Sequence, residues 1–412
     1  MQLVEQHIIK KNNPYYKECD KLCFDSKNLY NACLYKIRQE YIHNNISILN
    51  KLHYIMKNTS EYKKLPAKVS STVLNIVNLN FKSFFAALNS YKVNPTKFKG
   101  RPRLPYYLDK EKGRYFVSYT NQAISKKIFK KVKKIKLSKT NIEFNTRIKK
   151  FEDINCVRIV PKSGYYVIEV VYTILEANKL ADNNRYLSID LGVNNLATLT
   201  SNFKEIKPLI INGKPLKSIN QYYNKKLAHY TSILEKRNNK KVSNKTERLI
   251  LKRKNKIDNY MHKASKEIVK KCIKDKINTL IIGKNNNWKQ EINSGSKNNQ
   301  NFVNIPHSRF IDMLSYKCER EGINVKLQEE SYTSKASFLN LDNIPVYIKN
   351  NITNYEFGGY RKTRGMYKIK NESKEINADV NGSYNILRKA VPNVFNNGIE
   401  GIGVYPKVIT LK

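Results

Sequence analysis

The sequence is poor in acidic residues, in paired cysteines and in long apolar runs. Only 33 Asp and Glu stand against 77 Lys and Arg, so the 412-residue chain carries a formal net charge of +44. Its six cysteines include no Cys-x-x-Cys pair, which excludes a disulfide scaffold and predicts a reducing compartment. No apolar run approaches the roughly 20 residues of a membrane helix, and residues 1–13 lack the apolar core of a secretory signal.

Apolar side chains, in contrast, are well supplied. They make up 40% of the chain, which supports a packed core and excludes a disordered polybasic tail. A length of 412 residues predicts two to four domains at roughly 100–200 residues each. A charge of +44 calls for a polyanionic partner. Nucleic acid is the first candidate and an acidic membrane surface is a distant second.

The positive charge has two peaks along the chain. Residues 126–150 hold eleven Lys and Arg and one Glu, and residues 235–276 hold sixteen Lys and Arg and five acids. Basic runs commonly form solvated faces of a protein. Both runs are also interleaved with Phe, Ile, Tyr or Leu, which favours a surface that follows nucleic-acid phosphates.

The first 180 residues predict a small β-barrel that is interrupted by helices. Residues 1–14 and 93–180 contain short alternating runs, with a hairpin turn at 161–164. Residues 15–92 instead carry apolar side chains at spacings of three and four, which predicts a helical lobe inserted in the barrel.

The pattern of apolar and polar residues changes at residue 181. Successive strands are predicted at 186–190, 196–200 and 208–212, followed by a basic helical pair, a strand, a helix, a strand and a last helix at 221–276, 277–282, 306–321, 323–327 and 378–390. This order is that of an RNase H-like nuclease core made of residues 181–335 and 378–412. The predicted fold class is therefore multidomain α+β: a β-barrel with an inserted helical lobe, followed by an RNase H-like α/β nuclease domain with a C-terminal insertion.

Two aspartates lie where they could reach a metal ion. Asp190 ends the first strand of the predicted core, and Asp379 lies in the first turn of the last helix, behind the candidate N-cap Asn377. The helix dipole favours an ionised carboxylate at that place, as a hard metal ion requires. Taken singly, each acid has a plain structural explanation, Asp190 in the turn at Gly192 and Asp379 as a stabilising acid at a helix start.

The two segments that contain these acids identify a protein family more specifically when they are considered together than when each is considered alone. The chain resembles the TnpB/OrfB family of insertion-sequence nucleases, kin to Fanzor proteins and type V CRISPR effectors, in SIDLGVNNLATL, NFVNIPHSRFIDMLSYKCEREGINV, SYTSKAS, NADVNGSYNI, LYNACLYKIRQEY and RIVPKSGYYVIEVVY. The resemblance covers nearly the whole chain. It implies that the RNase H-like domain is of the type called RuvC, which cuts DNA paired with a bound guide RNA and uses three carboxylates and two Mg²⁺ ions.

The resemblance assigns Asp190 to the first motif and Asp379 to the third, but the second motif departs from the family pattern. The strand that usually ends in Glu ends here in Gly283. Either the site is inactive, or the third acid comes from the next strand, as in Fanzor-like relatives. Glu330 fits that displaced position before a Thr-Ser-Lys segment, with Glu329 in reserve. The alternative for both is a solvated strand end.

The zinc ribbon of most relatives is also missing. Residues 319–412 contain no Cys and no His, so we expect no zinc, and we predict a degenerate, zinc-free nucleic-acid-binding insert at 336–377 in the zinc-ribbon position. The alternative for its aromatic and basic side chains is a small apolar patch on a basic loop. The predicted nucleic-acid-binding residues are Lys97, Lys99, Arg101, Arg103, Lys130, Lys131, Lys133, Lys134, Arg361 and Arg364.

The predicted function is an RNA-guided, metal-dependent DNA endonuclease of the TnpB/OrfB type, with Asp190, Glu330 and Asp379 as catalytic and metal-binding residues. We expect Mg²⁺ or Mn²⁺ and a guide RNA as cofactors, double-stranded DNA as target, no membrane partner and a monomer. The expected location is the bacterial cytoplasm, at the nucleoid, or the nucleus of a eukaryotic source. The alternatives are a cleavage-dead RNA-guided DNA-binding protein, a transposase or accessory transposition protein, and a plain basic RNA-binding protein.

Overall fold

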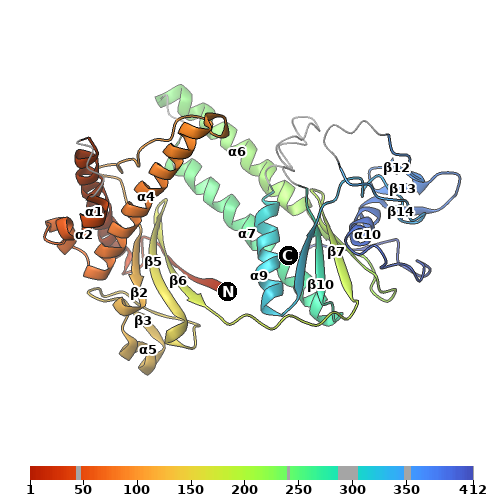
Figure 1. Cartoon of the computed structure of the whole chain (residues 1–412), viewed down its shortest axis with the longest axis horizontal. Coiled ribbons are helices and arrows are strands. Elements are labelled where there is room, and N and C mark those ends of the chain that lie inside the picture. The colour runs from red at the N-terminus through yellow and green to blue at the C-terminus, as the bar shows by residue number, and fades with distance from the viewer. Residues whose placement is uncertain (43–47, 239–241, 286–304, 348–353, 412) are drawn as a thin grey trace. The chain divides into compact units, whose positions relative to one another are not determined.

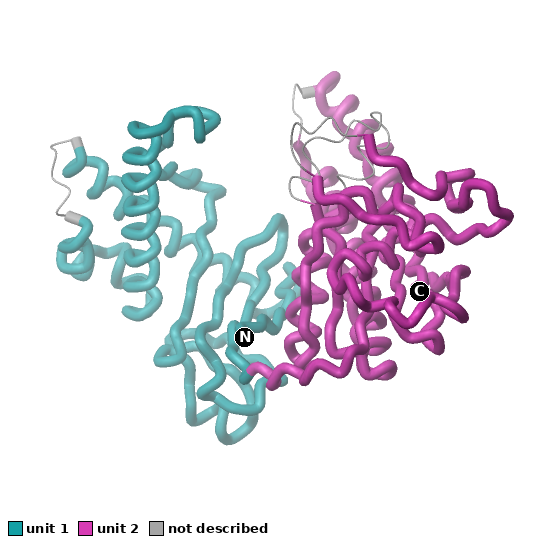
Figure 2. Tube along the Cα trace, turned by 45° about the vertical axis from the view of Figure 1, so that its right-hand side comes forward, with its two compact units in different colours: residues 1–175 teal, residues 176–412 magenta. Residues whose placement is uncertain are grey.

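The computed structural model describes residues 1–42, 48–238, 242–285, 305–347 and 354–411. The chain forms two compact units, residues 1–175 and 176–412 (Figure 2). The predicted helical lobe, the second basic run and the predicted insert each include some residues outside this description. No helix in the described ranges is long and apolar enough to cross a membrane.

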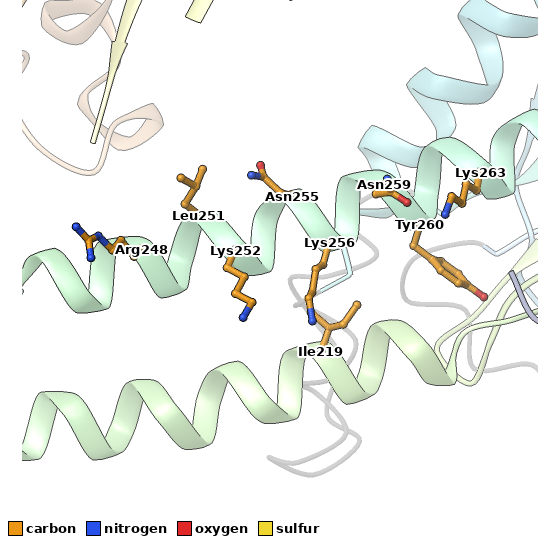
Figure 3. Close-up of a pocket in the computed structure, with 9 residues that line it drawn as sticks. All are labelled: Ile219, Arg248, Leu251, Lys252, Asn255, Lys256, Asn259, Tyr260 and Lys263. Atoms are coloured by element: carbon orange, nitrogen blue, oxygen red, sulfur yellow. The ribbon is translucent and has the colours of Figure 1, made fainter. Parts of the chain in front are cut away.

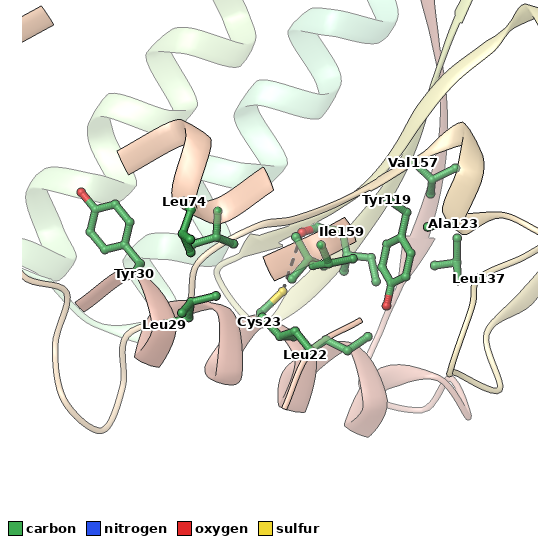
Figure 4. Packing of buried hydrophobic residues seen from close by; sticks show 14 of the residues in the cluster. Leu22, Cys23, Leu29, Tyr30, Leu74, Tyr119, Ala123, Leu137, Val157 and Ile159 are labelled. Atoms are coloured by element: carbon green, nitrogen blue, oxygen red, sulfur yellow. Dashed lines mark hydrogen bonds between the residues drawn. The ribbon is translucent and has the colours of Figure 1, made fainter. Parts of the chain in front are cut away.

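Unit 1 contains the predicted helical segment. Its helices are α1 (Tyr16–Ile42), α2 (Ile48–Met56), α3 (Ser60–Lys63) and α4 (Ala67–Val93) (Figure 1). Figure 4 shows Leu22 and Cys23 of α1 in the same buried cluster as Tyr119 and Ile159 of the neighbouring sheet. The Cys23 thiol donates to the Ile159 carbonyl oxygen at 3.7 Å. The helices therefore bury their apolar stripe against the strands of the same unit.

The strands of unit 1 form a four-stranded antiparallel sheet, in the order β1-β6-β5-β2, and a separate hairpin of β3 and β4. Their bounds are β1 (Gln2–Ile9), β2 (Val117–Thr120), β3 (Lys134–Lys136), β4 (Glu143–Asn145), β5 (Ile154–Lys162) and β6 (Tyr165–Thr173). Between them lie η1 (Pro95–Lys97), η2 (Asn121–Ala123), α5 (Lys126–Val132) and η3 (Phe151–Asp153). Within the described part of this unit, β1 and β2 are edge strands, so the closed barrel is not confirmed.

Unit 2 is built on a six-stranded mixed sheet with the order β11-β10-β7-β8-β9-β15. Its strands are β7 (Tyr186–Leu191), β8 (Asn195–Ser201), β9 (Leu209–Asn212), β10 (Thr279–Gly283), β11 (Asn324–Gln328) and β15 (Lys407–Ile409). The first three are antiparallel neighbours, whereas β10 runs parallel to both β7 and β11. The mixed α/β order predicted for this half of the chain is the order observed.

The helices of unit 2 cover both faces of this sheet (Figure 1). They are α6 (Lys214–Asn238), α7 (Asn244–Lys274), α9 (His307–Arg320) and α10 (Ala378–Ala390). One apolar core lies between the sheet and the helices α7 and α9, and a second lies under α10. A small antiparallel sheet of β12 (Gly359–Thr363), β13 (Met366–Ile369) and β14 (Glu375–Asn377) occupies the region of the predicted insert.

Alternation along the central strands decides which side chains face α10. Leu187 and Ile189 of β7 belong to the core under α7 and α9, so Ser188 and Asp190 face the opposite side. Ser188 donates from its hydroxyl to the Ser383 carbonyl oxygen of α10 at 2.8 Å, and both residues are buried. The last helix is thus fixed directly on the strand that carries Asp190.

Candidate active site

Asp190 lies at the end of β7 on the face that α10 covers. Its Oδ2 atom would lie 2.9 Å from a Cβ added to Gly382 of α10. Real Cβ atoms do not tolerate such a contact, so Gly382 is what allows the carboxylate to lie this close to the helix. The residue as a whole is half-buried.

Asp379, the second residue of α10, is held from two directions. The side-chain oxygen of the N-cap Asn377 accepts hydrogen bonds from the backbone N–H groups of Asp379 and Val380, both at 3.1 Å. The Asp379 carboxylate accepts a hydrogen bond from Asn195 Nδ2 at 2.6 Å and lies 3.5 Å from the Arg361 guanidinium. The predicted N-cap is confirmed, and the Asp379 carboxylate is directed toward the start of β8 and toward β12.

Glu330 uses the space left by the missing side chain of Gly283. A Cβ added to Gly283 would collide with Glu330 Oε2 and would lie 2.6 Å from Ile386 Cδ1. The carboxylate that follows β11 therefore reaches the point from which a side chain at the end of β10 would start. This position is compatible with the predicted displaced third acid.

A polar ridge of α10 holds the segment that carries Glu330. The ridge consists of three side chains at successive spacings of four residues, Asn381, Asn385 and Lys389. Both amides donate to the Ala336 carbonyl oxygen, at 2.8 and 2.7 Å, and the Lys389 ammonium donates to the Ser331 carbonyl oxygen at 2.9 Å. The segment after β11 is therefore fastened along the helix that also provides Asp379.

Glu329 has a different partner from Glu330. Its carboxylate forms an ion pair with Lys389 Nζ at 2.5 Å and accepts the Ser331 backbone N–H at 2.7 Å. Burial alone would raise the pKa of Glu329, but the contacts with Lys389 and Ser331 outweigh it and the pKa is lowered. These positions favour Glu330 over Glu329 as the third acid, whose role remains a prediction.

The two other predicted acids act electrostatically on Asp190. The pKa of Asp190 lies well above its usual value because of desolvation, then because of the Glu330 and Asp379 carboxylates, with Arg361 opposing them. The pKa of Glu330 is raised from 4.5 to about 7, first by desolvation and then by Glu329, with Lys389 opposing. Like charges gathered at one place cost free energy unless a cation is bound among them.

The donor set suits a hard divalent cation. All three side chains offer carboxylate oxygens, which Mg²⁺ and Mn²⁺ prefer. Glu330 Oε2 is buried and has no hydrogen-bond partner in the described part of the chain, a costly state that a cation would relieve. Among those same residues, however, no three His, Cys, Asp or Glu side chains converge in a group that could hold a metal ion. The donor chemistry therefore fits, but the described side chains are not drawn together as ligands of one ion.

A pocket of about 400 Å³ lies beside Asp379. It is lined by Gly192, Val193, Asn194, Asn195, Arg361, Arg364, Gly365 and Asp379. Two predicted nucleic-acid-binding residues, Arg361 and Arg364, thus share a pocket with one predicted catalytic residue. Guanidinium groups bind phosphate oxygens through paired hydrogen bonds, so the pocket is suited to a phosphodiester.

The other predicted nucleic-acid-binding residues lie in unit 1. All but one are exposed, namely Lys97, Lys99, Arg101, Arg103, Lys130, Lys131 and Lys133. Lys134 is half-buried on β3 and forms an ion pair with Glu143 at 3.1 Å. Exposure leaves these cations accessible to a polyanion, and their contacts with nucleic acid remain predictions.

Sequence reasoning missed the residues that support the acids. Gly382 gave a signal, because glycine inside a helix costs about 1 kcal/mol relative to alanine and indicates a close approach. The polar ridge also gave one, since two asparagines, which are poor helix formers, recur at a spacing of four in the helix. No sequence signal indicated Asn195, because its partner Asp379 lies 184 residues away.

The raised pKa of Glu330 predicts how folding stability depends on pH. With its pKa raised from 4.5 to about 7, the folded chain holds a proton that the unfolded chain releases, so stability falls as the pH rises through this window. Without divalent ions, Glu330→Gln is therefore expected to be more stable than the unmodified protein at pH 8, by about 1–3 kcal/mol, and nearly equal at pH 4.5. Urea unfolding at both pH values measures the difference.

Glu329→Gln is the matched control for this measurement. The pKa of Glu329 is lowered, so its contribution to stability is present at pH 8 and is lost as the pH falls through its folded-state pKa. This variant should be less stable than the unmodified protein at pH 8, which is the opposite sign. Equal shifts for the two variants would show that Glu330 is not in the strained environment described above.

Two family models match the chain. Residues 167–289 match OrfB_IS605, described as a probable transposase, and residues 307–386 match the Cas12f1-like TNB domain. The first range includes Asp190 and Gly283, and the second includes Glu330 and Asp379. No curated protein has a significantly similar sequence.

Three solved structures resemble the chain coarsely. A Cas12f1–sgRNA–target DNA complex is 15% identical, with 93% of this chain and 98% of that chain covered and a TM-score of 0.36. A CRISPR-Cas12f ternary complex is 17% identical, with coverages of 90% and 80% and a TM-score of 0.33. The mini-RNA-guided endonuclease CRISPR-Cas_phi3 is 9% identical, with coverages of 99% and 94% and a TM-score of 0.47. TM-scores below 0.5 give no support to a detailed comparison of folds. It is the two family models that confirm the resemblance of this chain to the TnpB/OrfB family, over the segments that hold the predicted acids.

Proposed function

We propose that this protein is an RNA-guided DNA endonuclease of the TnpB/OrfB type, with Asp190, Glu330 and Asp379 as its catalytic carboxylates. The observation that carries the proposal is the position of Glu330, whose carboxylate occupies the space beside Gly283 and, after desolvation, contributes to the raised pKa of Asp190. A chain that had lost the reaction along with the usual Glu would have no reason to keep a buried carboxylate without a hydrogen-bond partner at that place.

The carboxylates would hold Mg²⁺ or Mn²⁺, and no zinc is required. When bound, such ions activate a water molecule and stabilise the leaving oxygen of a phosphodiester. The residues of this chain orient the reacting groups: Asn195 holds the Asp379 carboxylate, and Gly382 lets Asp190 approach α10. Arg361 and Arg364 bind the phosphate of the strand in the pocket beside Asp379.

The same proposal assigns the parts of the chain. Residues 1–14 and 93–180 form the wedge-like β domain, and residues 15–92 form the recognition lobe. Residues 181–335 with 378–412 form the RuvC-type nuclease domain, and the insert at 336–377 binds nucleic acid without zinc. The strand order β9-β8-β7-β10-β11, with three antiparallel strands followed by two parallel ones, supports this assignment of the nuclease domain.

The test is a cleavage assay on the purified protein with its own RNA. The protein is isolated from cells that carry its locus, the copurifying RNA is sequenced, and DNA duplexes that match or do not match this RNA are offered. We expect cutting of matched DNA in Mg²⁺ or Mn²⁺, none in EDTA, and no effect of a zinc chelator. Guided binding without cutting in either ion would establish the cleavage-dead alternative, and the absence of a discrete RNA would refute RNA guidance.

A further inference from the structure

A second pocket, of about 550 Å³, lies between α6 and α7 (Figure 3). Its lining consists of Ile219, Arg248, Leu251, Lys252, Asn255, Lys256, Asn259, Tyr260 and Lys263. We call it the α6–α7 groove. Four of its nine lining residues are cations, two are amides and none is an acid. Its electrostatic complement is a polyanion.

The cations of the groove form a regular row. Arg248, Lys252 and Lys256 are spaced four residues apart on α7, which places successive charges about 6 Å apart along the helix. Figure 3 shows Lys252 and Lys256 directed toward α6, where Ile219 lies. All three cations are exposed, and within the described ranges none of them forms an ion pair with an acid. Their charge is therefore available to an external partner.

The dimensions of the groove favour one strand over a duplex. Arg248 and Lys263 are separated by about 22 Å along α7 at 1.5 Å per residue. Spread over this length, a volume of about 550 Å³ describes a narrow track along α7. Such a track can hold one sugar-phosphate backbone, and the second backbone of a B-DNA duplex would lie outside it, across a major groove about 12 Å wide.

One end of the groove is hydrogen-bonded to the rim of the candidate active site. The Tyr260 hydroxyl donates to the Asn212 carbonyl oxygen. The backbone N–H of the next residue, Gly213, donates to the Asn194 carbonyl oxygen at 2.7 Å. Asn194 itself lines the pocket beside Asp379. The Tyr260 end of the groove is thereby connected through two hydrogen bonds to the rim of that pocket.

We propose that the α6–α7 groove binds the backbone of the DNA strand that is cut, several nucleotides away from the scissile phosphate. The inference rests on the proposed function, because it takes the pocket beside Asp379 as the place of cleavage. A DNA strand fits better than the guide RNA, since only the strand to be cut needs a path that ends at this pocket. The amides of Asn255 and Asn259 add neutral hydrogen bonds to phosphate or sugar without reading the sequence.

The test measures binding of a single DNA strand by the full-length, RNA-loaded protein. A fluorescent 20-nucleotide strand without complementarity to the guide is titrated in EDTA at several salt concentrations. The variant is Lys252→Gln/Lys256→Gln, which keeps the helical propensity of both positions. Loss of two phosphate contacts should weaken binding about tenfold at low salt and reduce the slope of log affinity against log salt by about 1.4.

Lys254→Gln/Lys266→Gln is the matched control, because both lysines are exposed on α7 and neither lines the groove. It removes the same charge and should leave the slope unchanged. Equal losses in the two variants would overturn the proposal. Loss of copurified RNA from the groove variant, with DNA binding intact, would also overturn it and assign the groove to the guide. The measurement contains no cleavage step, so it is independent of whether the protein cuts.

Discussion

Glu330→Gln is expected to reduce cleavage of guide-matched DNA by about 10³-fold or more, while the variant still binds its RNA and its target. The substitution keeps the shape of the side chain and removes its charge. A two-metal site loses several kcal/mol of transition-state stabilisation when one of its carboxylates no longer holds a cation, and each 1.36 kcal/mol is tenfold in rate. Single-turnover cleavage in saturating Mg²⁺, with DNA binding measured in parallel, gives both quantities.

Glu329→Gln and Asp190→Asn are the two comparison variants for Glu330→Gln. Asp190→Asn should resemble Glu330→Gln, because both remove a predicted catalytic carboxylate and the charge of Glu330 acts on Asp190. Glu329→Gln breaks an ion pair with Lys389 that is partly open to solvent, so it should retain most of the activity. If both glutamate variants cut as fast as the unmodified protein, the displaced-acid hypothesis is wrong.

Gly283→Ala is expected to leave the protein folded and to cost it most of its activity. The added Cβ would collide with Glu330 Oε2 and would lie 2.6 Å from Ile386 Cδ1. Both atoms are the ends of flexible side chains, so the fold can adjust at a cost of about 1–3 kcal/mol. The Glu330 carboxylate can adjust only by leaving its place near Asp190, which misplaces the third acid. Thermal unfolding and cleavage of matched DNA, measured on one preparation, separate the two effects.

Gly100→Ala is the control for the loss of a glycine as such. Nothing lies within 4 Å of a Cβ added at Gly100, and this position has no positive φ angle. Gly100→Ala should therefore cut normally. A Gly283→Ala variant that cuts as well as Gly100→Ala would show that the space beside Gly283 does not matter for the reaction.

The elements of unit 2 could be predicted because each is specified by its own stretch of sequence. The last helix, for example, begins after Asn377 and ends before Pro392, and both boundaries are local signals. Closure of a barrel in unit 1 cannot be predicted from local signals, because it depends on pairing between strands that are far apart in the chain. The helix α5 was missed for another reason: its Lys-rich sequence was interpreted as surface charge, although Ser125 caps it by accepting from the Ile128 backbone N–H.

The residues of the candidate site also differ in whether local sequence could predict them. Asp190 and Asp379 lie inside continuous motifs and could be predicted from them. Glu330 could be proposed but not separated from Glu329, because strand alternation does not apply where β11 has already ended at Gln328. What distinguishes the two glutamates is contact with distant residues, Lys389 for one and the space at Gly283 for the other.

The polar ridge of α10 has a consequence for how the protein matures. A chain that has been synthesised only as far as residue 370 already contains Asp190 and Glu330, but it contains neither Asp379 nor the helix that holds the Glu330 segment against the sheet. In such a nascent chain the strands β7, β10 and β11 can already pair, but the segment after β11 lacks its hydrogen bonds from α10. Assembly of the proposed site therefore requires residues 378–390 to dock on the sheet. Unfinished or proteolysed chains that lack this helix would keep the exposed cations of unit 1 but would lack Asp379 and the hydrogen bonds that hold the Glu330 segment.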